Sequence, residues 1–166
     1  MVLYGEILKE FQKHKVQYVI AGGMAVNLLG SMRGTADLDI LVAMTDANLS
    51  KVVGILKKQG YKVRQPVDPM GIADAMIRRD WIKNKNMKAF NFFKDQECKE
   101  VDIIIDSPVS YVTARKNVIK IKSKDLELPV ISIKDLITMK RHSGRPQDQL
   151  DIEELKWIRK LRRKNL

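Results

Sequence analysis

The feature that most constrains this chain is a glycine pair followed, after a spacer of thirteen residues, by an Asp-Leu-Asp triplet. Gly22-Gly23 ends one apolar segment, and Asp37-Leu38-Asp39 opens another that runs to Val42. Side chains at i and i+2 of a strand point to one face, so Asp37 and Asp39 should project together while Leu38 faces a core. Adjacent carboxylates repel each other, and a divalent cation that prefers oxygen ligands relieves the repulsion. The triplet therefore predicts a site for Mg²⁺ or Mn²⁺.

The glycine pair predicts a phosphate site beside this metal site. Glycine has no Cβ, so Gly22 and Gly23 allow a sharp turn and a close approach of a ligand to the backbone. A short helix is expected over residues 25–29, and the N–H groups at its start would face an anion. Ser31 and Arg33 in the next loop are expected to contact phosphate oxygens, although a loop arginine is often simply exposed. A metal site and a phosphate site in one unit are what metal-assisted nucleotidyl transfer requires.

A third carboxylate lies in a later apolar segment, and with it the chain resembles a known superfamily. Val101-Asp102-Ile103-Ile104-Ile105 places Asp102 inside a strand-like run. The ordered set of Gly-Gly, Asp-x-Asp and apolar-Asp-apolar resembles the signature of the polymerase-β-like nucleotidyltransferases, and the resemblance extends from Gln17 to Leu155. It implies a two-ion site in which Asp37, Asp39 and Asp102 hold Mg²⁺ or Mn²⁺ and act in catalysis.

The C-terminal part narrows this resemblance. Lys140, Arg145 and the string Asp148-Gln149-Leu150-Asp151 resemble the small prokaryotic members, which include the abortive-infection toxin-type (AbiEii-like) transferases. In those members a lysine and then an Arg-Asp-x-x-Asp segment follow the third aspartate, whereas here two residues separate Arg145 from Asp148. The resemblance implies that Lys140 offsets triphosphate charge and takes part in catalysis, and that Asp148 hydrogen-bonds this lysine or the acceptor. The alternative is that Lys140 is an ordinary surface lysine on a cationic helix.

The activity that the resemblance implies is transfer of a nucleoside monophosphate from an NTP to a hydroxyl acceptor, with release of pyrophosphate. The acceptor would be RNA such as tRNA, a small molecule or a protein, and the toxin-type members imply an antitoxin protein as a partner. The net charge of +11 weakly favours a polyanionic acceptor. Six of the cations, however, lie between Lys156 and Lys164 with no acid among them. Such a helix end is as often a solvated face as a binding surface.

Two other classes of function are open from the sequence. One is a catalytically silent copy of the fold that acts by binding a protein, which the presence of all three carboxylates disfavours. The other is a basic nucleic-acid-binding module, but Phe90, Phe92 and Phe93 fit a hairpin core better than a base-stacking platform. Each motif also has a plain explanation, because Gly-Gly often marks only a turn and an Asp-x-Asp pair can be solvated. The ordered combination favours the enzyme.

Length and composition set the remaining bounds. A chain of 166 residues is expected to form a single domain, 1–166, and no apolar run approaches the roughly 18 residues of a membrane span. The first residues lack the basic-then-apolar pattern of a signal peptide. The lone cysteine, Cys98, excludes an internal disulfide and suits a reducing cytoplasm. With two histidines it makes no convincing zinc site.

The segments predict an α/β fold, namely a small mixed β-sheet with flanking helices, like a polymerase-β palm, closed by a C-terminal helical pair over about residues 132–164. Strands are expected at 17–21, 37–43, 61–64, 87–93, 100–105, 118–122 and 128–131. Helices are expected at 4–15, 25–29, 45–60, 72–85 and 110–115, and from 132 and 147. The buried stripe of the last helix is predicted to consist of Leu150, Leu155, Ile158 and Leu161. Asp106, at the exit of its strand, is expected to be only a cap or turn residue.

Overall fold

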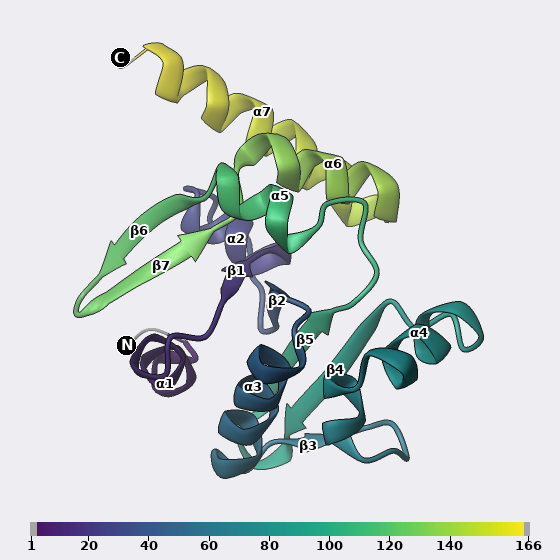
Figure 1. Ribbon diagram of the computed structural model, residues 1–166. Helices are drawn as coiled ribbons and strands as arrows, with labels where there is room; N and C mark the ends of the chain where they lie inside the picture. The colour runs from purple at the N-terminus through teal and green to yellow at the C-terminus, as the bar shows by residue number, and fades with distance from the viewer. Residues whose placement is uncertain (1–2, 165–166) are drawn as a thin grey trace.

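The computed structural model describes residues 3–164 and contains a seven-stranded mixed sheet flanked by helices (Figure 1). The strands are β1 (Tyr18–Ile20), β2 (Leu38–Val42), β3 (Lys62–Val63), β4 (Ala89–Lys94), β5 (Lys99–Ile104), β6 (Ile119–Ser123) and β7 (Leu126–Val130). The helices are α1 (Gly5–Lys13), α2 (Gly22–Leu28), α3 (Asp46–Lys58), α4 (Ala75–Lys83), α5 (Tyr111–Lys116), α6 (Ile133–Ser143) and α7 (Pro146–Lys164), with 3₁₀ turns at Pro69–Ala73 and Asp95–Glu97. The predicted fold class is confirmed.

The order of the strands places the two carboxylate-bearing strands next to each other near the middle of the sheet. The order is β3-β4-β5-β2-β1-β7-β6, in which β2–β5 and β1–β7 are parallel and the other neighbours antiparallel. All of β1 and most of β2 are buried. Strands that are covered on both faces have nearly continuous apolar sequences, and this explains why the sequence pattern identified them.

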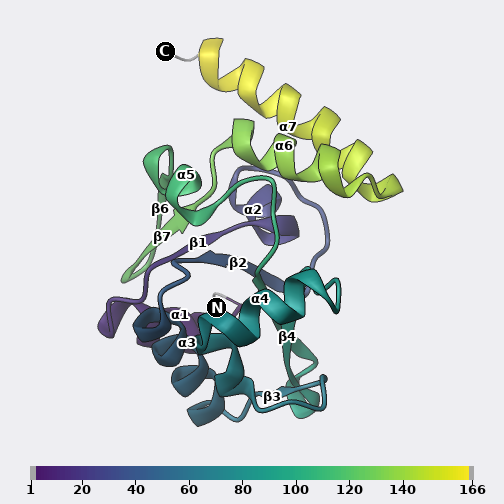
Figure 2. The same ribbon diagram turned by 45° about the vertical axis from the view of Figure 1, so that its right-hand side comes forward.

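The helices surround the sheet in two groups. In Figures 1 and 2, α6 and α7 lie side by side at one end of the molecule, above α2, while α1 and α3 lie toward the other end. Apolar residues of both groups join one buried cluster with the strands. From α1 this cluster receives Ile7, Leu8 and Phe11, as predicted. None of the helices within residues 3–164 has the length and hydropathy that crossing a membrane requires.

The C-terminal helical pair forms where the sequence predicts it. Ser132 caps α6, because its hydroxyl accepts a hydrogen bond from the backbone N–H of Asp135 (3.1 Å). Gly144 ends α6 with a φ of +66°, a left-handed conformation that glycine adopts without penalty. Pro146 then begins α7, at the helix position where its missing N–H costs nothing. The sharp reversal brings the first turn of α7 back beside the last turn of α6.

The buried face of α7 is more polar than the sequence predicts. Leu155 is buried as expected, but Leu150 and Leu161 are 65% and 42% exposed, so this part of the predicted stripe is wrong. Asp148 and Asp151 are buried in their place. A hydrophobic period of 3.6 residues cannot reveal a buried carboxylate whose cationic partner comes from a distant segment.

The glycine pair forms the first turn of α2 rather than a turn that precedes the helix. The sequence predicts a helix over 25–29, whereas α2 begins at Gly22. Gly22 has a φ of +59°, which costs a residue with a Cβ about 1–2 kcal/mol. A Cβ at this position would lie 1.8 Å from Oδ2 of Asp39, so the carboxylate occupies the space that a side chain would need. The close approach of α2 to β2 therefore requires glycine.

Gly22→Ala should lower the free energy of unfolding by more than about 2 kcal/mol, because left-handed strain and the collision with Asp39 act together. Gly54→Ala in α3 is the matched control, since its added Cβ would meet nothing within 4 Å. The control should raise stability by up to about 1 kcal/mol through helix propensity. Urea denaturation measures both variants, and equal midpoints for Gly22→Ala and the parent protein would contradict the close contact.

Candidate active site

A cleft of about 520 Å³ opens between the two carboxylate-bearing strands, the start of α2 and the α6–α7 pair. It is lined by most of the residues that the sequence predicts for the site: Gly22, Gly23, Arg33, Asp37, Asp39, Asp102, Lys140 and Asp148. Ser31 is not part of this lining, and its hydroxyl donates instead to Oε2 of Glu154 (2.8 Å). The fold thus gathers residues that are more than a hundred positions apart in the sequence around one cavity.

The register of the sheet brings the carboxylates together. β2 and β5 run parallel and pair Leu38 with Val101 and Asp39 with Asp102. Because paired residues of neighbouring strands point to the same face, the side chains of Asp39 and Asp102 lie next to each other. Asp37, just before β2, is exposed at the same cleft.

This crowding of carboxylates changes their acidity. Burial raises the pKa of Asp39 to about 6, and the negative charges of Asp102 and Asp37 add to the increase. Burial is also the main cause of a raised pKa at Asp102, to which the charge of Asp37 contributes. The cleft therefore holds negative charge that the protein does not fully neutralise.

Asn91 fixes the orientation of Asp102, a role that the sequence analysis did not assign. β4 pairs with β5 so that Asn91 lies opposite Asp102. Nδ2 of Asn91 donates to Oδ1 of Asp102 (2.7 Å) and to Oε2 of Glu100 (3.2 Å), and its own Oδ1 accepts from Nε of Arg64 (3.1 Å). The bond from Asn91 opposes the rise in the pKa of Asp102. The polar face of the predicted hairpin was the signal in the sequence for such a partner.

The chemistry of these carboxylates fits Mg²⁺ or Mn²⁺, although the protein by itself does not complete a metal site. Carboxylate oxygens are the ligands that these ions prefer, and a cation would relieve the charge that raises the pKa of Asp39. Within residues 3–164, no three His, Cys, Asp or Glu side chains converge closely enough to hold an ion. The three carboxylates are thus arranged more loosely than the sequence analysis expected.

Lys140 is buried and ion-paired, so the alternative that it is a surface lysine is wrong. The residue is 6% exposed. Its Nζ donates to Oδ1 of Asp148 (3.1 Å) and to Oδ2 of Asp151 (2.5 Å), both in the first turns of α7. Lys140 lines the cleft, but two carboxylates already balance its charge.

Asp148 links the end of α6 to the start of α7. Its Oδ2 accepts hydrogen bonds from the hydroxyl of Ser143 (2.7 Å) and from the backbone N–H of Arg145 (3.2 Å). Burial opposes ionisation of Asp148, but the hydrogen bonds from Ser143 and Lys140 outweigh it and hold its pKa below the usual range. The two residues inserted between Arg145 and Asp148 therefore leave this aspartate in contact with the predicted lysine.

Asp151 is the buried centre of this ion network, and its own role was not predicted. It is 1% exposed. Besides Lys140, it pairs with Arg33 from the loop between α2 and β2, and its Oδ1 accepts from Nε2 of Gln147 (3.2 Å). The network holds the α2–β2 loop against the C-terminal helices. Removing one partner of such a buried network leaves an uncompensated charge, which typically costs about 3–5 kcal/mol.

The rest of the cleft lining is partly apolar and received no role from the sequence. The apolar lining residues are Ala89, Ile104, Pro108, Leu136 and Met139. Lys88 and Asp106 form an ion pair in the same lining (2.5 Å). Asp106, which the sequence analysis expected to be only a cap or turn residue, is therefore a residue of the cleft.

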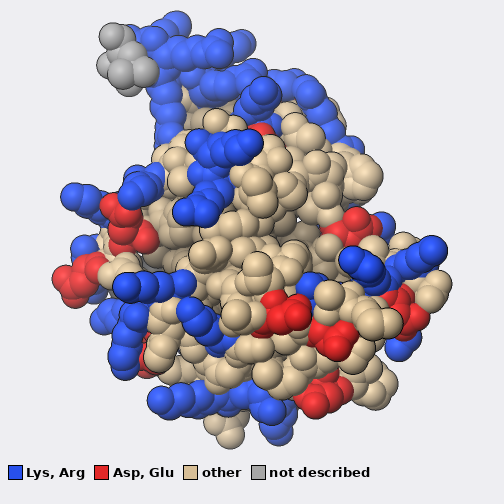
Figure 3. Space-filling view, viewed as in Figure 1, with Lys and Arg blue, Asp and Glu red and all other residues tan. Residues whose placement is uncertain are grey.

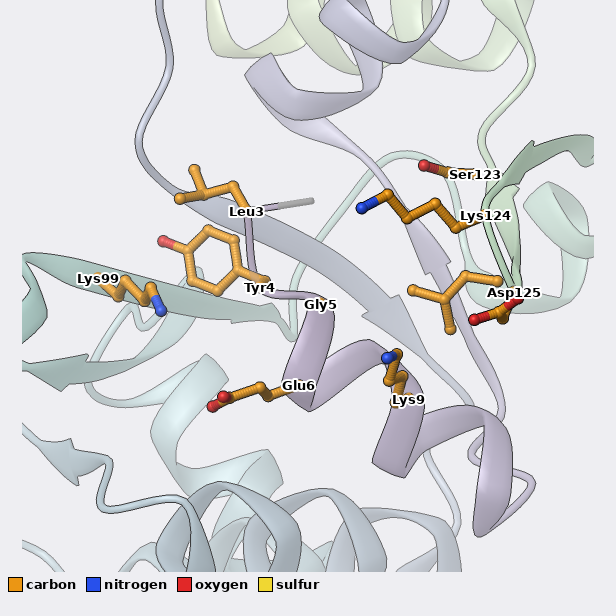
Figure 4. Close-up of a pocket in the computed structure, with 10 residues that line it drawn as sticks. Leu3, Tyr4, Gly5, Glu6, Lys9, Lys99, Ser123, Lys124 and Asp125 are labelled. Atoms are coloured by element: carbon orange, nitrogen blue, oxygen red, sulfur yellow. The ribbon is translucent and has the colours of Figure 1, made fainter. Parts of the chain in front are cut away.

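A second cavity, of about 390 Å³, lies between the start of α1, the start of β5 and the β6–β7 turn (Figure 4). Figure 4 shows the side chains of Lys9 and Lys124 at this cavity, with Leu3 and Tyr4 beside them. None of the three aspartates of the cleft lines it. The larger cleft, where glycine pair and carboxylates meet, is thus the candidate active site.

Tyr4 connects this second region to the carboxylate-bearing strands. Its hydroxyl is hydrogen-bonded to the backbone carbonyl of Ala36 and accepts from the backbone N–H of Glu100 (3.0 Å). The hydroxyl is protonated at neutral pH and can donate, and burial raises the pKa of Tyr4 further, to about 12. These two hydrogen bonds link Ala36, which precedes Asp37, to Glu100, which lies two residues before Asp102.

The free energy of unfolding of the ligand-free protein should fall as the pH rises from about 4 to about 6. The pKa of Asp39 is about 6 in the folded protein and 3.8 as its ordinary value, so the folded state keeps a proton that the unfolded chain has lost. This contribution is complete below about pH 4, is lost as the pH passes 6, and amounts to at most about 3 kcal/mol. Urea midpoints between pH 4 and pH 8, in EDTA, measure it.

Asp39→Asn should flatten this pH profile. The variant should be more stable than the parent protein at pH 7 and nearly equal to it at pH 4. Asp125→Asn, which alters an exposed carboxylate outside the cleft, should keep the parental profile. The assignment to Asp39 is wrong if its variant follows the parental profile as well.

Three solved structures resemble this fold over nearly the whole chain. The crystal structure of the lincosamide antibiotic adenylyltransferase LnuA, lincomycin-bound, aligns with 92% of this chain and 94% of its own, at 22% identity and a TM-score of 0.61. The solution structure of the antibiotic-resistance factor ANT(2'')-Ia aligns over 98% and 90%, at 13% identity and a TM-score of 0.57. The crystal structure of ANT(2'')-Ia in complex with adenylyl-2''-tobramycin aligns over 98% and 96%, at 13% identity and a TM-score of 0.56. At these identities the likeness establishes a shared fold.

The sequence itself identifies the family. No curated protein matches it significantly. A family model described as "Nucleotidyltransferase of unknown function (DUF6036)" matches residues 4–166, a span that includes the glycine pair, the three aspartates and the α6–α7 network. The predicted nucleotidyltransferase class is thereby confirmed. The match does not test the predicted toxin-type subgroup. The chain belongs to the nucleotidyltransferase family DUF6036 and is an enzyme of that class.

Proposed function

We propose that this enzyme transfers a nucleoside monophosphate from an NTP to a hydroxyl group and releases pyrophosphate. The observation that carries the proposal is that one cleft contains the glycine-started helix α2 and the in-register pair Asp39 and Asp102. A phosphate-facing backbone next to a carboxylate pair suits a metal-bound triphosphate. The match to a nucleotidyltransferase family supports the same activity.

The proposed roles follow from where the residues lie. Gly22 and Gly23 let the first turn of α2 approach the phosphates closely. Asp37 and Asp39 would hold Mg²⁺ or Mn²⁺ together with the nucleotide, and Asp102 would complete the ligands of a second ion. When bound, such ions stabilise the charge on the attacking and leaving oxygens of a phosphoryl displacement.

The reaction exchanges one bond at the α-phosphorus. The acceptor oxygen forms a bond to this phosphorus while the bond to the bridging oxygen of pyrophosphate breaks and that oxygen keeps the electron pair. The acceptor hydroxyl also loses its proton. Asp102 is the carboxylate that we propose as its acceptor, because Asn91 holds it in a fixed orientation at the cleft.

For the acceptor we propose first a small molecule with a hydroxyl group. The solved structures of similar fold include enzymes described as antibiotic adenylyltransferases or bound to an adenylylated antibiotic. The cleft supports this choice, because its volume of about 520 Å³ is typical of small-ligand sites. Its apolar lining by Ile104, Pro108, Leu136 and Met139 would cover a ring or an alkyl group of the acceptor.

A second candidate acceptor is an RNA end, and the charge of α7 favours it. The cations from Lys156 to Lys164 gather at the outer end of α7, as Figure 3 shows at the top of the molecule. Trp157 in this stretch is 60% exposed and offers a surface on which a base can stack. The first turn of α7 lines the cleft, and the helix extends from there for about 28 Å. A single strand that lies along α7 would have its end at the cleft.

The compartment and protein partner follow the sequence analysis. The exposed thiol of Cys98 suits a reducing cytoplasm, where NTPs are available, and we place the enzyme there. The toxin-type resemblance of Lys140 to Asp151 predicts an antitoxin partner. Expression of the chain alone would then arrest growth, and the Asp39→Asn variant would not.

Asp37→Asn, Asp39→Asn and Asp102→Asn should each reduce transfer by more than about 100-fold. Loss of a residue that only hydrogen-bonds a metal ligand already lowers activity about 10- to 100-fold. The three aspartates would contact the ions themselves, so their loss should have a larger effect. The assay follows label from each α-labelled NTP, with Mg²⁺, into lincosamides, aminoglycosides, total RNA and lysate. Asp125→Asn is the control. Variants that unfold early in urea yet transfer like the parent protein would assign the three aspartates a structural role instead.

Replacement of Lys160, Arg163 and Lys164 by glutamine should weaken the binding of single-stranded RNA and lower its salt slope by about 2, since each phosphate contact contributes about 0.7. Trp157 reports this binding by fluorescence, because Trp81 is 4% exposed and stacked on Phe90. The matched control replaces the exposed Lys51, Lys57 and Lys58 of α3. If both triple variants lose the same affinity, the end of α7 is only a solvated face.

A further inference from the structure

The four lysine and arginine side chains at the cleft differ in whether a carboxylate already pairs with them. Arg33 pairs with Asp151, Lys88 with Asp106, and Lys140 with Asp148 and Asp151. The fourth, Arg145, is exposed at the cleft, and no carboxylate within residues 3–164 forms an ion pair with it. A cation that is already neutralised must break its pair to bind an anion, whereas Arg145 need not.

Arg145 lines the same cleft as the carboxylate cluster of Asp37, Asp39 and Asp102. Its side chain is exposed there, where the phosphates of a metal-bound nucleotide would lie. Lys140 lines this cleft as well, but its ammonium group is enclosed by two carboxylates.

The backbone N–H of Arg145 is hydrogen-bonded, whereas its guanidinium forms no ion pair in the described part of the chain, residues 3–164. Gly144 turns the chain out of α6, and the N–H of Arg145 then donates to Oδ2 of Asp148 (3.2 Å). Asp148 is itself fixed by Ser143 and Lys140. The buried ion network thus fixes the position of the Arg145 backbone at the rim of the cleft.

The start of α7 is a poorer anion site than this guanidinium. The carboxylate of Asp148 already accepts the backbone N–H of Arg145 at the helix start, and its negative charge lies beside the first turn. A second anion there would face repulsion. Arginine presents several N–H donors in a planar fork that matches two phosphate oxygens at once.

We propose that Arg145 binds the triphosphate of the nucleotide, and that Lys140 and Arg33 instead hold the shape of the cleft through Asp151. This assignment rests on the proposed function and deepens it. It replaces the role that the family resemblance implied for Lys140 as the residue that offsets triphosphate charge. Arg145 would contact the pyrophosphate part, so it should distinguish an NTP from a nucleoside monophosphate.

The test is calorimetric binding of each NTP, and of the matching nucleoside monophosphate, in Mn²⁺ and without acceptor. Arg145→Gln should bind the preferred NTP about 10- to 100-fold more weakly, as expected for loss of a charge-assisted hydrogen bond, and bind the monophosphate within about twofold of the parent protein. Arg145→Lys should recover part of the loss. Arg141→Gln is the matched control, because Arg141 is exposed three residues before Gly144 and does not line the cleft.

Stability measurements separate this role from that of the network. Arg145→Gln should keep the parental urea midpoint, whereas Lys140→Met should lower it clearly, because it leaves Asp148 and Asp151 buried without their cation. The proposal is overturned if Arg145→Gln and Arg141→Gln bind the NTP equally well, or if Arg145→Gln loses NTP and monophosphate alike. If the parent protein binds no NTP at all, the proposed function itself fails, and the assignment of Arg145 fails with it.

Discussion

The parallel pairing of β2 with β5 is the constraint on which the rest of this structure depends. It sets Asp39 beside Asp102, and the close packing of α2 then presses Gly22 against the Asp39 carboxylate. The arrangement is unfavourable for the protein alone, since the pKa of Asp39 rises to about 6 through burial and through the charges around it. A protein tolerates such an unfavourable arrangement where a ligand relieves it, and a metal-bound nucleotide is the ligand that we propose for these residues.

The ion network of α6 and α7 has a different task. Buried ion pairs rarely add net stability, but they define geometry, because each member is costly to leave unpaired. Here Asp151 joins Lys140 to Arg33, so that a loop following α2 is fixed to a helix more than a hundred residues later. Arg145, by contrast, lines the cleft without an ion pair to any carboxylate within residues 3–164. The α6–α7 pair thus contains both the buried ion network around Asp151 and, next to it, the exposed guanidinium of Arg145.

The sequence by itself determined the fold class and the identity of the central residues. Continuous apolar runs marked β1 and β2, since strands buried on both faces tolerate little else. The apolar residues around Asp102 marked β5, which alternates between buried and half-buried residues. The spacing of the glycine pair and the Asp-x-Asp motif located two sides of the cleft, because i and i+2 side chains of a strand share a face. The C-terminal helices could be placed from a serine cap and a glycine stop.

The tertiary structure decided which charged groups are paired, and this changed several roles. Lys140 became a buried member of a network, Ser31 turned away from the cleft toward Glu154, and Asp106 became part of the cleft lining. Periodicity shows which residues are apolar enough to be buried, but a carboxylate or an ammonium group is buried only when a partner meets it in space. One partner of Asp151 is Arg33, which is 118 residues away in the sequence, and no local sequence pattern can predict such a contact.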